Sequence, residues 1–544
     1  MRKIISISIL CISLNIHAQN PQEHNLSGNL QLNYQTFQED STINAKEQKP
    51  YTSGYTNLLY NYKNFTVGTR LEIYNNPIDA FEEYDGYGIA NKFIQYKNNF
   101  IDITLGNIYD EFGSGLIFRT YFDSNLGVDN SVQGGRVKIQ PTKGIYLTGL
   151  MGQQKSYWEY SESVVRGFNA DIALNESLLK NWQSIINVGA SFVTKKEIND
   201  DEPLYKLPEN VGAFNSRVNI TKGNTTLNLD YAYKINDPSA DNNTIYQNGH
   251  GLILNGNYSK KGFGVSFGAK RIQNMSFRSE RNAILQDLNI NYITPFTKQQ
   301  SYSLATIYPY ASQSNGEMGS QIDIYYKIPK KSKLGGKYGT SISFNFSNVF
   351  DIHRTIAEDT STLNESGTLG YNSEFLKLGE KLFQEINLEI SRKINRKLKL
   401  IGTFIYLENN DKLLKSQPLL EGKGYEYIKA NIIILEVFYK IKPKHSTRIE
   451  IQHLQTEQHY GNWCMGLIEY KISPHWFWSI QDLYNYGHPT KKIHYYSLST
   501  GYNHGAHRLS ITYGKQRAGL FCVGGVCRDV PASNGFSISL TSSF

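Results

Sequence analysis

The chain has 544 residues, of which 40% are hydrophobic, 13% aromatic and 19% charged, with a formal net charge of +8. No apolar run of about 18 residues follows the N-terminal leader, which excludes a helical membrane protein. Lys gathers at short turns and not in one patch, so nucleic-acid binding is not expected. The 39 Tyr, 26 Phe and 45 Gly suit the girdles, lumen and turns of a β-barrel.

The N-terminus has the layout of a secretory signal peptide. Arg2 and Lys3 precede a short apolar stretch, and Ala18 supplies the small residue at the expected cleavage point. We therefore predict that residues 1–18 are a signal peptide. We also predict that residues 19–544 form a single barrel domain, because no linker or change of composition divides the rest of the chain.

Most of the remaining chain shows the two-residue periodicity of β-strands. In one clear case Phe65, Val67, Leu71 and Ile73 share one face and polar residues occupy the other. The predicted strands are 26–34, 55–62, 65–74, 92–96, 100–106, 134–139, 145–152, 168–174, 185–193, 214–220, 225–233, 251–258, 263–270, 285–292, 302–310, 321–326, 338–346, 386–390, 398–406, 427–439, 447–454, 464–470, 476–483, 495–501, 507–513 and 536–544.

Short turns rich in Lys, Gly and Pro alternate with long connections. Short turns include 141–144, 221–224, 259–262, 329–331, 442–444 and 473–475, and long connections include 37–53, 107–133, 194–210, 351–381, 408–425 and 514–534. Bacterial outer-membrane barrels have this asymmetry, with short periplasmic turns and long extracellular loops. We predict an all-β fold, a transmembrane antiparallel β-barrel of about 26 strands, within a range of about 22 to 26.

The long connection 107–133 is too apolar for a loop that lies in water. Its apolar residues are Phe112, Leu116, Ile117, Phe118, Tyr121 and Phe122. Our hypothesis is that it folds into the lumen, where Asp110, Glu111, Arg119 and Asp123 set the charge at a constriction. The alternative is an extended strand end that packs on its neighbours.

The last long connection contains the sequence CVGGVC at residues 522–527. A two-residue Gly-Gly turn would pair Val523 with Val526 and place Cys522 opposite Cys527. Export to an oxidising compartment favours a disulfide between the two cysteines. A metal site is the alternative, but it lacks a second pair of ligands nearby. We predict no metal and no cofactor.

The C-terminal strand is two-faced and ends on an aromatic residue. Phe536, Ile538, Leu540 and Phe544 share one face, opposite Ser and Thr. A terminal Phe of this kind is part of the assembly signal of outer-membrane barrels, which is the role we predict for these four residues. The alternative, an edge strand of a soluble sandwich, does not explain the alternating loop lengths.

Catalytic motifs are not evident, and we expect no enzyme. Ser114 lies between two glycines without the spacing of a nucleophile elbow, and no His-Glu-x-x-His pair occurs. The histidines of the last hundred residues fall mainly at turns or strand ends, where they are ordinarily solvated. An enzyme would need Ser, His and an acid to converge near one rim.

Four stretches resemble a Bacteroidota outer-membrane family that carries only a domain-of-unknown-function label, number 6029. They are 106–137, 302–319, 461–477 and 514–544, and the cysteine hairpin with Arg528 and Pro531 is the most specific of them. The resemblance covers nearly all of the mature chain. It implies export and an outer-membrane barrel, and it brings no catalytic residues and no substrate.

These features together predict a pore or transporter of the cell outer membrane with a polar, loop-restricted lumen. The alternative function is a non-transporting barrel that scaffolds envelope secretion or outer-membrane assembly machinery. The expected partners are outer-membrane lipid, the outer-membrane assembly machinery during biogenesis, and envelope proteins. A continuous polar lumen would favour the pore, whereas apolar patches on the long loops would favour the scaffold.

Overall fold

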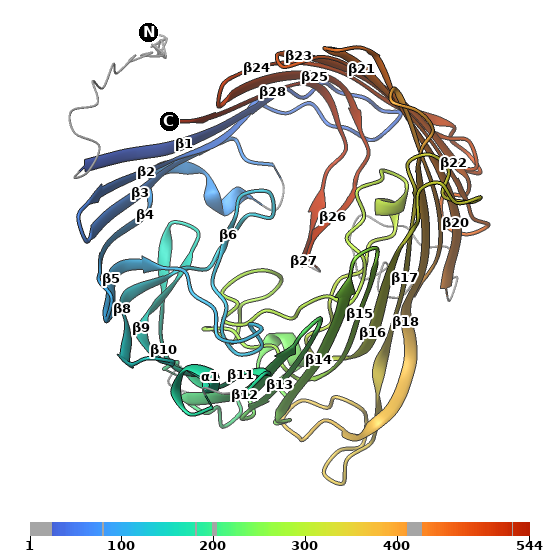
Figure 1. Ribbon diagram of the computed structural model, residues 1–544. Helices are drawn as coiled ribbons and strands as arrows, with labels where there is room; N and C mark the ends of the chain where they lie inside the picture. The colour runs from blue at the N-terminus through green and yellow to red at the C-terminus, as the bar shows by residue number, and fades with distance from the viewer. Residues whose placement is uncertain (1–23, 79–80, 180–181, 199–203, 411–426, 525) are drawn as a thin grey trace.

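The described residues form a closed antiparallel β-barrel of 24 strands (Figure 1). The computed structural model describes residues 24–78, 81–179, 182–198, 204–410, 427–524 and 526–544. The predicted signal peptide, 1–18, lies outside the described residues. No helix in the described part of the chain is long and apolar enough to cross a membrane.

The wall strands follow one another in chain order, each paired with the next. They are β1 (His24–Gln35), β2 (Tyr51–Tyr62), β3 (Phe65–Asn75), β4 (Gly86–Lys97), β5 (Ile101–Ile108), β8 (Val132–Thr142), β9 (Ile145–Ser156), β10 (Glu159–Ala173), β11 (Ile185–Lys196), β12 (Asn210–Lys222), β13 (Thr225–Lys234), β14 (Gly249–Lys260), β15 (Phe263–Gln273), β16 (Gly316–Ile328), β17 (Thr340–Thr355), β18 (Asn372–Lys393), β19 (Leu398–Asn410), β20 (Tyr427–Lys442), β21 (His445–Gln455), β22 (Trp463–Ile472), β23 (Trp476–Asn485), β24 (Ile493–His504), β25 (His507–Gln516) and β28 (Ser533–Ser543).

Four short strands and four short helices lie in the described parts of the connections. They are β6 (Phe122–Asp123), β7 (Val128–Asp129), β26 (Gly519–Val523), β27 (Val526–Val530), η1 (Glu82–Tyr84), η2 (Ala240–Asn242), η3 (Ala305–Ile307) and α1 (Leu174–Ser177). The two short hairpins, β6–β7 and β26–β27, lie inside the barrel (Figure 1).

The two faces of the wall differ as the periodicity predicts. On β3 the side chains of Phe65, Val67 and Leu71 are 44–45% exposed on the outside, whereas Arg70 and Glu72 are buried inside. Alternate residues of a strand point to opposite faces. The wall therefore presents apolar side chains outward and, on this strand, an ion pair inward.

The first and last strands close the barrel. β28 pairs antiparallel with β1 and with β25. Beyond the end of β28, the backbone N–H of Phe544 donates to the carbonyl of Gly28, and the Gly28 N–H donates to the Phe544 carbonyl. A Cβ at Gly28 would lie 2.6 Å from Cζ of Phe544, so the terminal ring needs a glycine beneath it. Phe536, Ile538 and Phe544 are exposed on the outer face, as the alternation predicts.

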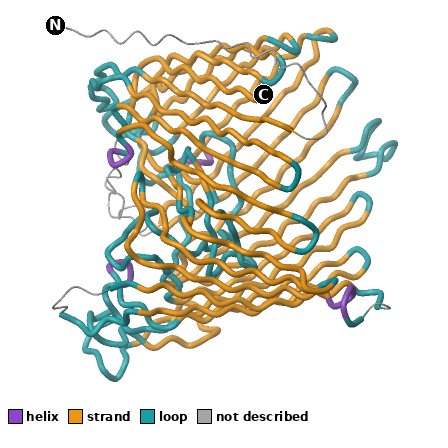
Figure 2. The backbone as a smooth tube through the Cα atoms, turned by 90° about the vertical axis from the view of Figure 1, so that its left-hand side faces the viewer, coloured by secondary structure: helices purple, strands orange, loops and turns teal. Residues whose placement is uncertain are grey.

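Short turns lie at one end of the barrel and long loops at the other (Figure 2). Two connections differ from the expectation. β9 and β10 are joined at the long-loop end by residues 157–158 alone, and nearly half of the predicted loop 351–381 is strand. The β17–β18 hairpin is extended by irregular pairing that runs to Thr355 and Asn372.

The strand count falls from the expected 26 to 24 because one predicted pair does not belong to the wall. Residues 285–292 and 302–310 were expected to be wall strands, but both lie in the connection between β15 and β16. Leu285 is exposed, but Leu288, Ile290, Leu304 and Ile307 are buried by other loops and the inner wall. All the other predicted strands overlap wall strands of the structure.

Candidate functional site in the barrel lumen

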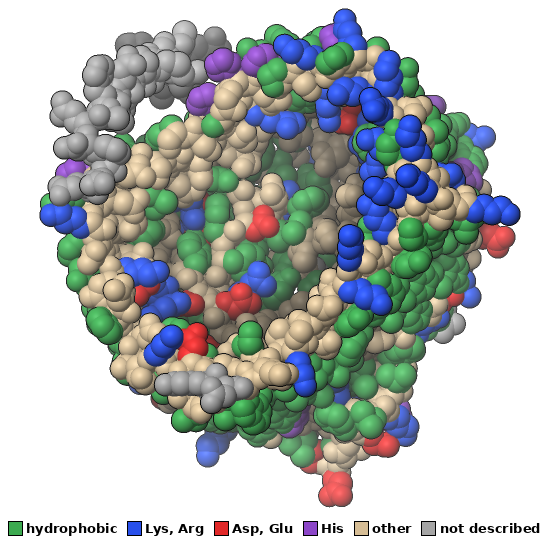
Figure 3. Space-filling model, in the orientation of Figure 1, with side chains coloured by type: hydrophobic (Ala, Val, Ile, Leu, Met, Phe, Trp, Pro, Cys, Tyr) green, Lys and Arg blue, Asp and Glu red, His purple; other side chains and the backbone are tan. Residues whose placement is uncertain are grey.

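Three long loops fold back into the lumen and meet there (Figure 1). We name them loop A (109–131, between β5 and β8), loop B (274–315, between β15 and β16) and loop C (517–532, between β25 and β28). Figure 3 looks along the barrel axis and shows a hollow in which acidic, basic and hydrophobic side chains lie together. Lys and Arg side chains gather along part of its rim.

Loop A packs on the inner wall through an apolar cluster. Phe112, Leu116, Ile117 and Phe118 are at most 1% exposed. The wall supplies the other side of the cluster from β9 to β15, with Leu150, Val165, Val193, Val211, Ala213, Ala232, Ile253 and Ile272. The loop is therefore folded inward, as the first hypothesis proposed, and is not an extended strand end. Burial of this apolar surface drives the inward folding of loop A.

A buried ion network also fixes loop A to the wall. Asp129 pairs with Arg70 and, at 2.6 Å, with the ammonium group of Lys155. Arg70 pairs in addition with Glu72, and the hydroxyl of Tyr109 donates to Asp129 at 2.8 Å. Removing one member of such a network leaves an uncompensated buried charge, which is strongly destabilising.

The four predicted constriction residues are not brought together in one ring. Asp110 is held by wall cations, at 3.3 Å from Arg136 and 2.8 Å from Lys138. The carboxylate of Asp123 accepts from two backbone N–H groups of the turn after β6. Only Glu111 and Arg119 face each other, 3.9 Å apart and partly exposed. Their influence on ion selectivity stays a prediction.

Loop A and loop B form a common unit. The N–H of Arg119 donates to the carbonyl of Ile290 at 2.8 Å, and the N–H of Tyr292 donates to the carbonyl of Gly115 at 3.0 Å. The guanidinium of Arg119 also lies 4.1 Å from the centre of the Tyr292 ring. A cation over an aromatic face is attracted by about 0.5 to 2 kcal/mol.

The second half of loop B packs on a different part of the wall. Leu304, Ile307 and Tyr308 are buried against a cluster from β19 to β23 that includes four residues of β20: Ile428, Ala430, Ile432 and Ile434. The N–H of Leu304 donates to the Gln452 side chain at 3.0 Å. Loop B therefore links two separate regions of the inner wall.

Loop C docks its disulfide hairpin against loop B. The predicted disulfide is confirmed: Cys522 and Cys527 are bonded, with Cα atoms 4.1 Å apart, and Val523 pairs with Val526. Gln299 donates to the Cys522 carbonyl at 3.1 Å and accepts from the Gly524 N–H at 3.0 Å.

Further contacts hold the tip and the outgoing strand of the hairpin. The Tyr292 hydroxyl donates to the Gly524 carbonyl, and Gln286 donates to the Cys527 carbonyl at 3.2 Å. Gly524 has a φ of +57°, and a Cβ there would lie 2.5 Å from the Tyr292 hydroxyl, so glycine suits both the turn and the contact. Arg528 donates to the Asn125 carbonyl of loop A at 2.5 Å. Loop C thus touches both other loops.

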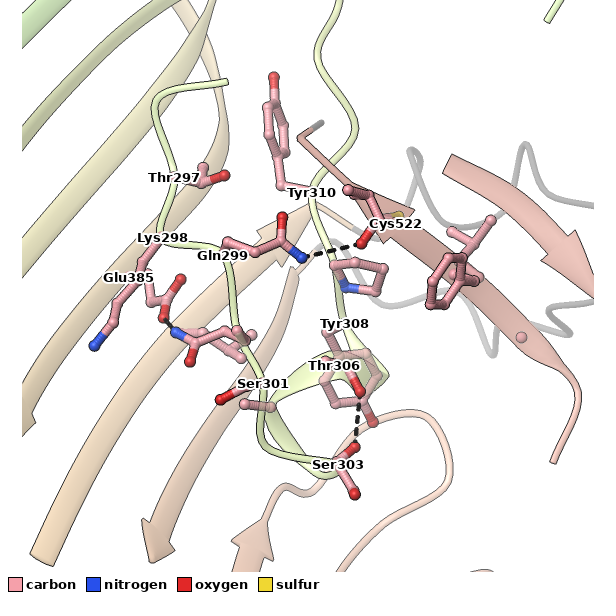
Figure 4. A pocket seen from close by; sticks show the side chains of 18 of the residues that line it. Thr297, Lys298, Gln299, Ser301, Ser303, Thr306, Tyr308, Tyr310, Glu385 and Cys522 are labelled. Atoms are coloured by element: carbon pink, nitrogen blue, oxygen red, sulfur yellow. Dashed lines mark hydrogen bonds between the residues drawn. The ribbon is translucent and has the colours of Figure 1, made fainter. Parts of the chain in front are cut away.

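Cavities border the loops, and two of them lie between the loops and the wall. The first, of about 490 Å³, lies between loop B, the hairpin of loop C and the wall. Figure 4 shows it, with Glu385 of β18 on one side and Cys522 on the other. The second, of about 570 Å³, is polar and is lined by Glu111 and Ser114 of loop A and by wall residues that include Arg217 and Asp230.

Loop B and its contacts were missed by sequence reasoning. A usable signal lies in β20, where Ile432, Ile433, Ile434 and Leu435 are apolar on both faces. Ile433 and Leu435 are exposed outside, whereas Ile432 and Ile434 are at most 1% exposed inside. An apolar inner face in a barrel with a polar lumen indicates that another segment packs there.

The geometry defines a class: a large closed β-barrel whose lumen is occupied by three of its own loops. The chain belongs to the family of unknown function DUF6029, whose family model matches residues 1–544. A search of curated proteins gave no match.

Solved structures of outer-membrane proteins are similar at low identity. The P pilus usher PapC translocation pore has a TM-score of 0.45 and 10% identity over 95% of this chain and 98% of that chain. The siderophore receptor PirA from Pseudomonas aeruginosa has a TM-score of 0.42 and 9% identity over 97% of this chain and 81% of that chain. A BenF-like porin from Pseudomonas fluorescens has a TM-score of 0.30 and 8% identity over 82% of this chain and 97% of that chain.

Proposed function

We propose that the protein is an outer-membrane pore or transporter whose lumen is gated by loop C. The observation that carries the proposal is a contrast between the loops. Loops A and B bury apolar clusters on the wall, whereas the hairpin of loop C adds one partly buried residue, Leu520, to the second cluster and otherwise meets loop B through hydrogen bonds to its backbone. Such bonds exchange readily with water, at a net cost of about 1 kcal/mol each. Loop C is therefore the part that moves.

The outer membrane is the proposed location. The closed sheet leaves no unpaired edge, and its outer face carries exposed apolar side chains such as Val67, Ile433 and Leu498. A closed barrel with an apolar exterior satisfies every wall hydrogen bond in lipid. Outer-membrane lipid is accordingly its first partner, and the assembly machinery its partner during biogenesis.

The assembly role of the last strand is tested by Phe544→Ala. We expect the amount of folded protein in the outer membrane to fall severalfold, because the aromatic end of the strand is lost from the assembly signal and from its place over Gly28. Quantitative immunoblots of outer-membrane fractions measure the effect. Phe65→Ala, another exposed outward Phe, is the control. Equal levels of the two variants would refute an assembly role specific to Phe544.

Conductance in planar bilayers tests the pore directly. Purified, folded wild type is expected to show ion-conducting openings. Arg119→Ala is expected to shift selectivity toward cations, because it leaves Glu111 without its 3.9 Å partner. It is also expected to open more often, because it removes the contact that holds Tyr292, whose hydroxyl bonds the tip of loop C. Arg508→Ala, at an exposed position of β25, is the control. Absence of conductance from demonstrably folded wild type would contradict the proposal.

A second candidate function, a scaffold for envelope machinery, is favoured by one feature. The β17–β18 extension exposes Phe375, Leu376 and Leu378 at 51%, 80% and 49%, and Figure 1 shows this hairpin jutting from the barrel. Exposed apolar clusters of this kind mark protein contact sites. Cross-linking through a cysteine at position 376 tests it: a specific envelope protein captured there would support the scaffold, and its absence would count against it.

A further inference from the structure

We propose that the cavity between loops B and C binds a short peptide through its charged ends. This inference rests on the proposed function, since it names the solute class that the gated lumen would admit. It starts from the volume of about 490 Å³, which lies within the range of small-molecule sites, about 300 to 1,000 Å³. The cavity borders the hairpin of loop C, so a ligand there would touch the movable element.

The first ionisable group of the cavity is a buried acid. Glu385 on β18 lines it and is 3% exposed. Its carboxylate accepts hydrogen bonds from the Gln300 and Asn387 amides, and no ion pair involves it within the described residues. Lys298, labelled beside it in Figure 4, acts on Glu385 electrostatically at longer range but forms no ion pair with it. A carboxylate held only by amides can still accept from an ammonium group.

The second charge is a guanidinium. Arg517 of loop C also lines the cavity, and among the described residues its donors reach the carbonyls of Ala518 and Thr306 alone, both at 3.3 Å. In the part of the chain that is described it has no carboxylate partner. Burial lowers the pKa of this guanidinium, as expected for a cation that has lost water without gaining an anion. The guanidinium can therefore receive a carboxylate.

The remaining lining suits the body of a peptide. Tyr308 is 1% exposed, and its hydroxyl has no hydrogen-bond partner among the described residues. Phe383, Leu407 and Leu520 provide apolar walls. A neutral saccharide would leave both charges unpaired in a desolvated site, which is costly. A zwitterionic peptide with an apolar side chain can instead pair its ammonium group with the carboxylate, its carboxylate with the guanidinium and its side chain with the apolar walls.

Calorimetric titration of the folded, full-length protein in detergent with the tripeptide Ala-Phe-Ala tests the proposal. Wild type is expected to bind the free tripeptide at least about tenfold more tightly than its N-acetylated or C-amidated form, because each loses one charge-assisted contact. Glu385→Gln should weaken binding of the free tripeptide and no longer discriminate against acetylation. Arg517→Gln should no longer discriminate against amidation.

The control is Glu389→Gln, which removes the same charge four residues along the same face of β18 and outside the cavity lining. It should bind as wild type does. Equal affinity for capped and free peptide, or binding of maltotriose without the tripeptide, would overturn the peptide assignment. Folding is checked for every variant by heat-modifiable migration. Conductance without tripeptide binding would refute this inference alone, and binding without conductance would refute the pore alone.

Discussion

The double substitution Cys522→Ser/Cys527→Ser is expected to raise the open probability of the pore about 30-fold. A disulfide that closes so short a loop stabilises the structured hairpin by about 2 kcal/mol relative to its flexible form. A difference of 1.4 kcal/mol changes an equilibrium tenfold. The bonds from Gln299 and Tyr292 that dock loop C require an ordered hairpin backbone. Disorder of the hairpin therefore destabilises the docked, closed state by the same free energy.

Single-channel recording in planar bilayers measures this effect. Wild type treated with a membrane-impermeant reductant should behave as the double variant does. Cys464→Ser is the matched control, because Cys464 is a free cysteine on β22. If the double variant shows wild-type openings while its barrel stays folded, loop C is not the gate.

The wall of the barrel could be predicted from sequence because the residue pattern of each strand depends only on the two environments that its faces contact. A strand with lipid on one side and a polar lumen on the other must alternate, as Phe65, Val67 and Leu71 do opposite Arg70 and Glu72. Turn chemistry gives the pairing, since Lys63-Asn64 leaves only two residues to reverse the chain. The disulfide was predictable for the same reason, as its two cysteines flank a two-residue turn.

The contents of the lumen could not be predicted in this way. The segments 285–292 and 302–310 alternate as strands do, but their partners are distant loops and the inner wall. Asn291 donates to the Leu116 carbonyl at 3.0 Å, across 175 positions of sequence. The local sequence does not show whether the apolar side chains of such a segment pack against a loop or face lipid. The apolar inner face of β20 could have indicated that a segment crosses the lumen.

The candidate site was predicted only in outline. The inward fold of loop A followed from its apolar composition, because such a loop cannot remain in water. The ion-pair partners of the charged residues of loop A could not be predicted from its composition. Asp110 was expected at a constriction and instead pairs with Arg136 and Lys138 of the wall. No sequence pattern links Glu385 with Arg517, because one lies in an ordinary strand and the other in a loop 132 positions away.

The substitution Phe118→Ala is expected to release loop A from the wall while the barrel itself remains folded. Phe118 is fully buried and packs on Phe112, with ring centres 4.9 Å apart. Truncation of a buried Phe to Ala costs about 3 to 5 kcal/mol. Loop A then loses a large part of the apolar contact that holds it inward. The wall strands keep their hydrogen bonds, because the pairs β5–β8 and β8–β9 do not involve this side chain.

Limited proteolysis of the detergent-solubilised protein measures the release. Cleavage is expected to begin after Arg119 with trypsin in the variant, at a rate at least about tenfold above wild type, while heat-modifiable migration of the barrel is unchanged. Phe65→Ala is the control, since Phe65 is 45% exposed on the outer face. A variant that loses heat-modifiable migration together with loop protection would mean that loop A stabilises the barrel as a whole. In that case loop B, which hydrogen-bonds to loop A at Ile290 and Tyr292, would share that structural role, and the gate would be confined to loop C.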